Sequence, residues 1–230
     1  MQTDRYFYIA TLPALGGLGS APPMGLADLI EHVEQRERWQ TLVGALVLMD
    51  DLLQREAFLA GEIEDVEPAV LGVQQVRGET PLPDYLTPEE HEEGPVAVES
   101  DRLWATYFHY ATEVGRRMRS KFLPQWVAFE VALRNALAAA RARRLGLEEH
   151  DYLVATHLAD EQADLSGVVS EWEAATTPLA GLRVIIRARW QWIEQHDAWF
   201  TFSEDELLVH AARVMLLEQW KRTEQQTENS

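Results

Sequence analysis

The hydrophobic positions between residues 121 and 146 repeat with the period of an α-helix. Large apolar side chains recur in this stretch at spacings of three and four, which places them on one buried face: Phe122, Trp126, Phe129, Leu133 and Leu137. Pro124 suits a first helical turn, and Gly146 suits a left-handed C-terminal cap. The pattern therefore predicts a central helix whose core includes Trp126 and Phe129.

A second face of this predicted helix carries small side chains, mostly alanine, around Asn135. Small side chains let a neighbouring helix approach closely, so we expect Asn135 to be buried at a helix contact and hydrogen-bonded there. Glu130 and Arg134 stand four residues apart, which predicts an ion pair along the helix.

Helical periodicity returns on both sides of this segment. Residues 26–60 predict two helices that meet near Arg36, and Gly61 with the acidic residues after it ends the second. Another helix is expected to begin at Asp101. Before all of these, residues 6–10 are expected to form a short extended segment.

The C-terminal third predicts further helices from its capping residues. Residues 147–176 suggest two short helices, and Thr177 before a proline suits the N-cap of the next one. Ser203 and Glu206 have the spacing of a capping box for the last helix, whose polar tail from Thr223 is expected to fray.

The chain is therefore expected to be mainly all-α, a multi-helix bundle in one or two lobes. Residues 79–101 contain eight acidic residues, four prolines and no Lys or Arg, which is typical of an exposed connection. The predicted division is an N-terminal lobe over 1–78, the acidic proline-rich connection over 79–101 and a C-terminal lobe over 102–230. The two lobes either stay separate or pack as one domain.

Two adjacent carboxylates interrupt an apolar run of the first half. Asp50 and Asp51 follow Met49, where buried carboxylates are costly unless they are paired. Either they lie on a solvated edge of the helix, or they make a polar contact with another helix or subunit. The sequence favours the solvated edge.

Composition narrows the classes of partner. A formal net charge of −18 argues against nucleic acid or an anionic membrane surface as the main partner. The absence of cysteine excludes disulfides and thiolate metal sites. The longest uncharged run, residues 6–27, is broken by prolines and glycines, so no membrane span is expected.

Charge is distributed unevenly along the chain. Residues 116–144 hold eight basic residues and one acid, a net +7, so the remainder of the chain carries −25. Arg141, Arg143 and Arg144 end this basic segment. Either they bind an acidic partner, or they complement the helix C-terminus and neutralise acids of the same chain, which is slightly favoured.

Three tryptophans fall within ten residues, Trp190, Trp192 and Trp199. One helix face cannot bury all three, so either two sides are covered or a partner docks here, with Trp192 as the candidate. Core packing is the favoured alternative.

The chain contains none of the motifs that carry familiar chemistry. Glu-x-x-His, His-x-x-x-His, a GxSxG elbow and a Walker-type glycine loop do not occur. We therefore predict no catalytic, cofactor-binding or metal-ligating residues, and a protein that is not an enzyme.

The sequence FLPQWVAFEVALRNALAAARARRLG resembles the signature Phe-Leu-x-x-Trp-x-x-Phe-x-x-x-Leu-Arg-Asn-x-Leu-Ala-Ala of a bacterial family of unknown function. Genes of that family are found in operons for V/A-type rotary ATPases. Trp126, Phe129, Arg134 and Asn135 are the matching positions that we assign structural roles. YFYIATLPAL, VLMDDLLQREAFLAGE, LPDYL and RWQWIEQHDAWFTF look like further family segments in the same order, with a departure at Leu52.

The resemblance implies a non-catalytic part of a proton- or sodium-translocating rotary ATPase. The family is similar in presumed role to the C subunit (eukaryotic d subunit), a helical socket between the membrane rotor ring and the central stalk. It implies the stalk and ring subunits as partners and a cytoplasmic location, peripheral on the inner membrane. The alternatives are a stand-alone helical adaptor or assembly factor and, third, an enzyme without a recognisable motif.

Overall fold

The part of the chain that the computed structural model describes, residues 9–87, 99–197 and 203–228, consists of helices joined by loops and turns. It contains eight α-helices and three short 3₁₀ turns, and no strand occurs within it. The helices are α2 (Leu26–Val33), α3 (Glu37–Leu59), α4 (Val73–Val76), α5 (Glu99–Arg117), α6 (Phe122–Leu145), α7 (Ser166–Ala174), α8 (Pro178–Gln195) and α9 (Glu204–Glu228). The turns are η1 (Asp84–Leu86), η2 (Glu149–Tyr152) and η3 (Thr156–Leu158). The all-α prediction is confirmed.

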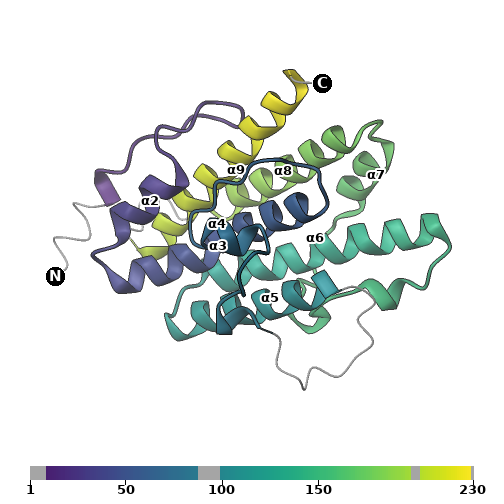
Figure 1. Cartoon of the computed structure of the whole chain (residues 1–230), viewed down its shortest axis with the longest axis horizontal. Coiled ribbons are helices and arrows are strands. Elements are labelled where there is room, and N and C mark those ends of the chain that lie inside the picture. The colour runs from purple at the N-terminus through teal and green to yellow at the C-terminus, as the bar shows by residue number, and fades with distance from the viewer. Residues whose placement is uncertain (1–8, 88–98, 198–202, 229–230) are drawn as a thin grey trace.

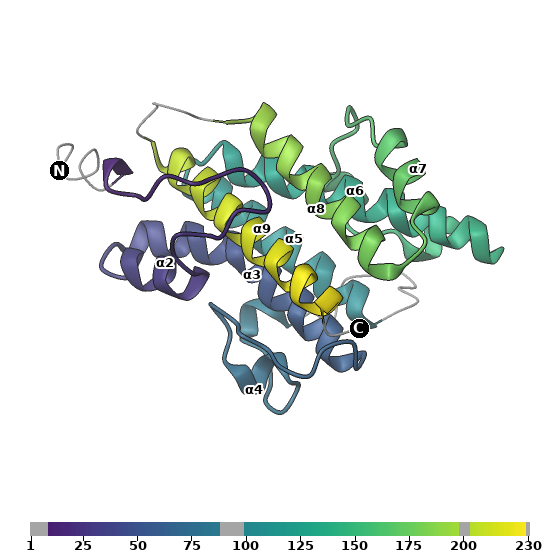
Figure 2. The same ribbon diagram turned by 90° about the horizontal axis from the view of Figure 1, so that it is seen from above.

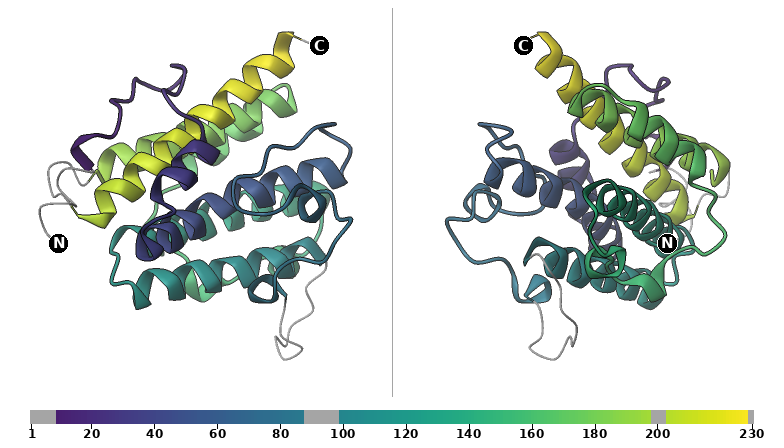
Figure 3. Two further views of the ribbon diagram at one scale, coloured as in Figure 1. Left: turned by 60° about the vertical axis from the view of Figure 1, so that its left-hand side comes forward. Right: turned by 90° about the vertical axis from the view of Figure 1, so that its right-hand side faces the viewer.

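Helix α3 lies at the centre and packs against α5 on one side and α9 on the other (Figures 1 and 2). Helix α6 runs beside α5, α8 runs beside α9, and the short α7 lies against α8. Figure 3 shows α8 and α9 as a pair above α3, with α5 and α6 below it. The described apolar side chains of both predicted lobes join one core cluster. The lobe boundaries themselves stay a prediction.

The central helix forms as its pattern predicts. Helix α6 has Pro124 in its first turn and ends at Gly146, whose φ of 68° lies in the left-handed region that glycine adopts without strain. The amide of Leu147 donates to the Ala142 carbonyl at 2.9 Å, which closes the helix end. Trp126 and Phe129 are buried, as predicted.

Three other predicted helix boundaries are also confirmed. Arg36 separates α2 from α3, and α3 ends at Leu59 just before Gly61, which has a φ of 72°. At the start of α8 the Thr177 hydroxyl accepts a hydrogen bond from the Ala180 amide at 3.1 Å. These boundaries depend on capping interactions between residues a few positions apart, so the local sequence is enough to predict them.

Two local predictions are wrong where the structure describes the residues. Ile9 and Ala10 have helical rather than extended backbone, and the rest of the segment 6–10 lies outside the described residues. Residues 147–176 form η2, η3 and the single helix α7 instead of two helices. The chain there is tied to α6 by backbone contacts that periodicity does not reveal, such as the Asp160 amide on the Ala128 carbonyl at 3.0 Å.

The end of α9 is anchored rather than frayed. Thr223 is 1% exposed, and α9 continues to Glu228. The Arg183 guanidinium donates to the Thr223 hydroxyl, to the Thr223 carbonyl and to the Thr227 hydroxyl, at 3.0–3.1 Å. The tail holds because an arginine of α8 satisfies a carbonyl near the helix end.

The predicted acidic connection is partly structured. Its first residues run into η1, where Leu86 is buried and Tyr85 stacks on Tyr110 of α5 with ring centroids 4.6 Å apart. Helix α5 begins at Glu99, two residues before the predicted start. The segment 88–98 lies outside the described residues.

Candidate functional site

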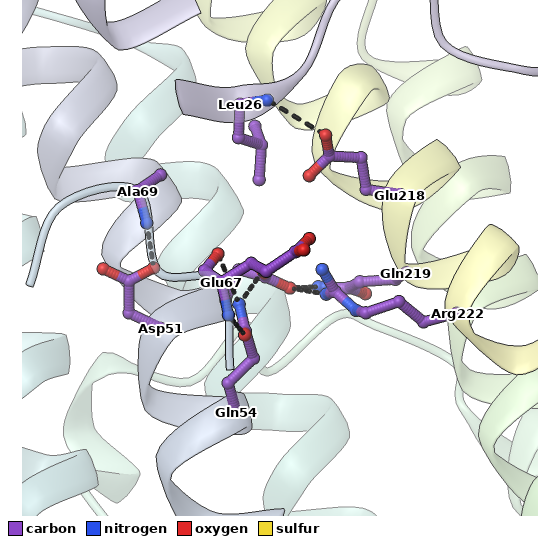
Figure 4. Close-up of polar contacts among 9 residues, drawn as sticks. Leu26, Asp51, Gln54, Glu67, Ala69, Glu218, Gln219 and Arg222 are labelled. Atoms are coloured by element: carbon purple, nitrogen blue, oxygen red, sulfur yellow. Dashed lines mark hydrogen bonds and ion pairs between the residues drawn. The ribbon is translucent and has the colours of Figure 1, made fainter. Parts of the chain in front are cut away.

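A buried polar network surrounds the two adjacent carboxylates of α3 (Figure 4). Asp51 is 0% exposed, and its oxygens accept backbone N–H bonds from Ala69, Val70 and Leu71 at 2.7–2.9 Å. One carboxylate therefore satisfies three successive amides of the irregular segment between α3 and α4, and it fastens that segment to the bundle.

The pKa of Asp51 results from effects that act in opposite directions. Burial raises the pKa of its carboxyl from the ordinary 3.8 to about 6, which exceeds the lowering effect of the three backbone donors. The neighbouring Asp50 carboxylate also raises this pKa. Asp51 is therefore poised to gain a proton under mildly acidic conditions.

Asp50 joins α3 to α9. Its carboxylate accepts hydrogen bonds from Gln54 at 2.9 Å and Gln219 at 2.8 Å, and it forms an ion pair with Arg222. Gln54 in turn exchanges two hydrogen bonds with the backbone of Glu67. Since Asp50 is only 1% exposed, the expectation of a solvated helix edge is wrong, and both carboxylates make contacts within the chain.

Glu218 of α9, directly before Gln219, contributes a third carboxylate to the network. Glu218 accepts the backbone N–H of Leu26 at 3.1 Å, so it satisfies a free amide at the start of α2 (Figure 4). Burial raises the pKa of Glu218, with Arg222 acting in the opposite direction. The network therefore ties α2, α3 and the segment after α3 to α9, and its geometry is that of a structural fastening.

A second buried ion pair joins α6 to α8 and corrects another expectation. Both nitrogens of the Arg189 fork donate to the two carboxylate oxygens of Glu130 at 2.8 Å, with side chains 9% and 5% exposed. Glu130 therefore pairs with Arg189 rather than with Arg134. The interhelical pair prevails because a bidentate guanidinium satisfies both oxygens of a carboxylate that is removed from water.

Arg134 connects three helices from the outer side of α6. It lies 3.0 Å from Asp101 of α5 and 3.7 Å from Glu56 of α3, and its guanidinium stands 4.7 Å over the Trp104 ring. Its predicted role in the structure therefore involves different partners from the ones expected.

Trp192 lies in an aromatic cluster between α6 and α8. Its ring is 5.3 Å from Phe129, 5.4 Å from Trp126 and 4.0 Å from the stacked His196 ring, and it is 8% exposed. Trp190 is also buried, and Trp199 lies outside the described residues. The geometry corresponds to the core alternative for Trp192, because almost none of its ring is accessible to a docking partner.

Asn135 is half-buried and bonds to a loop instead of a helix. Its amide nitrogen donates to the Val154 carbonyl and its amide oxygen accepts the Val154 N–H, both at 2.9 Å. The Asn135 side chain thus satisfies both backbone groups of Val154, which lies in the loop between η2 and η3, as a neighbouring strand would. The expectation of hydrogen bonding holds, and the expectation of a helix contact is wrong.

We expect replacement of Asn135 by Leu to lower the free energy of unfolding by roughly 1–3 kcal/mol, because both backbone groups of Val154 lose their partner. Chemical denaturation monitored by circular dichroism measures this loss. Gln125→Leu, at an exposed position of the same helix, is the matched control and should leave the midpoint unchanged. Equal midpoints for both variants would contradict the role of Asn135.

The three arginines at the end of α6 are exposed, and their surroundings differ. Arg143 pairs with Glu149 at 3.0 Å, on the surface, and the Arg141 guanidinium stands 5.9 Å from the Trp172 ring. Among the described residues neither Arg141 nor Arg144 has an ion-pair partner. Internal neutralisation therefore accounts for Arg143 alone.

Two exposed apolar residues lie beside these arginines in the chain, and the sequence pattern does not single them out. Leu145 is 62% exposed and Leu147 is 44% exposed, on either side of Gly146. The sequence signal for them is the stop at Gly146, since Leu145 is the last residue of α6 and Leu147 follows the cap, where the buried face of the helix ends. Arg141, Arg144, Leu145 and Leu147 together are called the α6 end surface below.

Within residues 9–87, 99–197 and 203–228, no three His, Asp or Glu side chains lie together as metal ligands do. None of the described helices has the length and apolar composition of a membrane span.

The geometry defines an acidic all-α bundle with one exposed basic and apolar helix end. The family described as protein of unknown function (DUF2764) matches residues 79–229, about two thirds of the chain. The chain belongs to this family. The match includes α5 to α9, and hence the α6 end surface, but not Asp50 or Asp51. The comparison with curated proteins gave no significant match, and neither did the comparison with solved structures.

Proposed function

We propose that this protein is a non-catalytic subunit or accessory protein of a V/A-type proton- or sodium-translocating rotary ATPase. The resemblance of the α6 sequence to a family encoded beside such ATPases supports the choice of complex. In this proposal the protein binds at the cytoplasmic face of the inner membrane, between the rotor ring and the central stalk.

The observation that carries a binding role is the α6 end surface. Two arginines without an ion-pair partner among the described residues and two exposed leucines fall within residues 141–147 of a chain whose formal net charge is −18. Exposed apolar side chains beside unpaired charges are the composition of a surface that binds another protein.

The interior of the bundle supports a mechanical role. The Glu130–Arg189 pair and the aromatic rings around Trp192 hold α6 against α8 by long side chains with fixed geometry. A socket transmits torque through its shape and its polar contacts, so it needs buried contacts that resist sliding and no reactive groups.

Affinity purification of the tagged protein from its own host, after gentle detergent extraction, tests this proposal. We expect the catalytic, stalk and ring subunits of a rotary ATPase to co-purify with it. Recovery of the protein alone, under conditions in which the ATPase stays assembled, would sink the proposal. Co-purification with assembly intermediates only would favour an assembly factor instead.

A further inference from the structure

We propose that the α6 end surface is a docking site for an acidic protein segment that presents apolar side chains between its carboxylates. This inference rests on the proposed function, because it names the kind of surface that the partner offers. Its four residues are Arg141, Arg144, Leu145 and Leu147.

The position of this surface favours contact with another molecule. Helix α6 is 24 residues long, and its C-terminal end projects beyond α5 in both views (Figures 1 and 2). At 1.5 Å per residue the helix is about 36 Å long, so this end is remote from the turn that joins α5 to α6. A projecting helix end reaches a partner without rearrangement of the bundle.

The backbone that carries the two leucines has a defined conformation. Gly146 adopts the left-handed conformation, and the Leu147 amide is bonded to the Ala142 carbonyl. The chain therefore turns back at a defined angle, which holds Leu145 and Leu147 on the outside. Little backbone conformational entropy is therefore lost when such a preformed turn binds.

Interactions within the chain do not account for this surface. Arginines at a helix C-terminus are stabilised by the helix dipole, which explains a cation there but not an exposed leucine on each side of Gly146. Of the six large hydrophobic side chains that are exposed among the described residues, two belong to this surface. A partner that covers both would account for two exposed leucines beside two arginines that have no ion-pair partner among the described residues.

Charge complementarity selects the chemistry of the partner. Guanidinium groups bind carboxylates with two parallel hydrogen bonds, so Arg141 and Arg144 favour Asp or Glu side chains. The leucines favour apolar side chains between those acids. A second copy of this chain is a poor occupant, since two molecules of charge −18 repel each other.

A photo-cross-linking amino acid placed at position 147 of the full-length protein, in its own host, tests the inference. We expect an adduct whose partner peptide, identified by mass spectrometry, carries clustered Asp or Glu with apolar residues between them. The same cross-linker at position 125, an exposed position near the other end of α6, should not give this adduct.

Charge reversal provides the matched comparison. Arg141→Glu/Arg144→Glu should reduce the adduct yield about tenfold or more, because attraction becomes repulsion. Arg116→Glu/Arg117→Glu changes the net charge equally at two exposed residues near the start of α6, and it should leave the adduct unchanged. Thermal melting of the two variants should agree closely, because each places two acids near a helix C-terminus, and this agreement excludes a folding defect particular to Arg141→Glu/Arg144→Glu.

Four outcomes overturn the inference. These outcomes are an adduct with a second copy, with lipid, or with a neutral or basic segment, and an adduct that survives Arg141→Glu/Arg144→Glu. If ATPase subunits co-purify but position 147 does not cross-link to them, the docking site is wrong and the proposed function stands. If the acidic partner is not an ATPase subunit, the docking site stands and the proposed function is wrong.

Discussion

Replacement of Arg189 by Met should lower the free energy of unfolding by about 3–5 kcal/mol, the usual cost of breaking a buried ion pair by removing one partner. Glu130 would then keep its charge with 5% of its side chain exposed and both oxygens without their donor. Urea denaturation at neutral pH, followed by tryptophan fluorescence, measures the loss.

The double variant Glu130→Met/Arg189→Met is the decisive control. Two apolar side chains of similar length remove the stranded charge, so most of the lost stability should return. If the double variant were at least as unstable as Arg189→Met, the account would be contradicted. The loss of stability would then come from packing and not from an unpaired carboxylate.

Replacement of Asp51 by Ala should cost roughly 3–5 kcal/mol, because three backbone N–H groups lose their acceptor at once. The amides are those of Ala69, Val70 and Leu71. Native-state hydrogen exchange should show faster exchange at these three amides. Asp84→Ala, at an exposed position of η1, is the control and should leave the exchange rates unchanged.

Asp51 should contribute a measurable component to the pH dependence of the free energy of unfolding. Because its pKa is raised from 3.8 to about 6 on folding, the folded state binds a proton that the unfolded state has released between these values. Stability from this residue is therefore complete below about pH 4 and falls as pH rises to about 6, by about 1.4 kcal/mol per pH unit. Asp51→Asn cannot titrate and should lack this component. Parallel stability curves for the original protein and Asp51→Asn would contradict the raised pKa.

Predictions that depend on neighbours in the sequence succeed in this protein. Gly146 and Thr177 set helix boundaries through contacts within four residues, so local pattern is enough to find them. The buried face with Trp126 and Phe129 follows from helical spacing in the same way.

Predictions that depend on the choice of a distant partner fail. Glu130 pairs with Arg189, 59 residues away, instead of with Arg134 on the next turn. Asp50 finds Gln219 and Arg222 across the bundle, at separations that no local pattern encodes. A carboxylate inside an apolar run states only that a partner must exist; the tertiary packing decides which one.

The candidate docking surface could also be predicted only in part from the sequence. The arginines of the α6 end are evident as a basic segment, whereas the leucines become significant only when the structure shows them exposed beside arginines that have no ion-pair partner among the described residues. The sequence therefore indicates the charge of the surface, and the structure adds its apolar component and its projection from the bundle.

Quantitative mass spectrometry of the intact rotary ATPase, purified through a tag on a catalytic subunit, tests the central claim most directly. The account predicts that this protein is present in a fixed ratio to the central stalk subunits and remains so after a high-salt wash that keeps the complex assembled. Its absence from the assembled complex, with the stalk and ring subunits all present, would contradict the account.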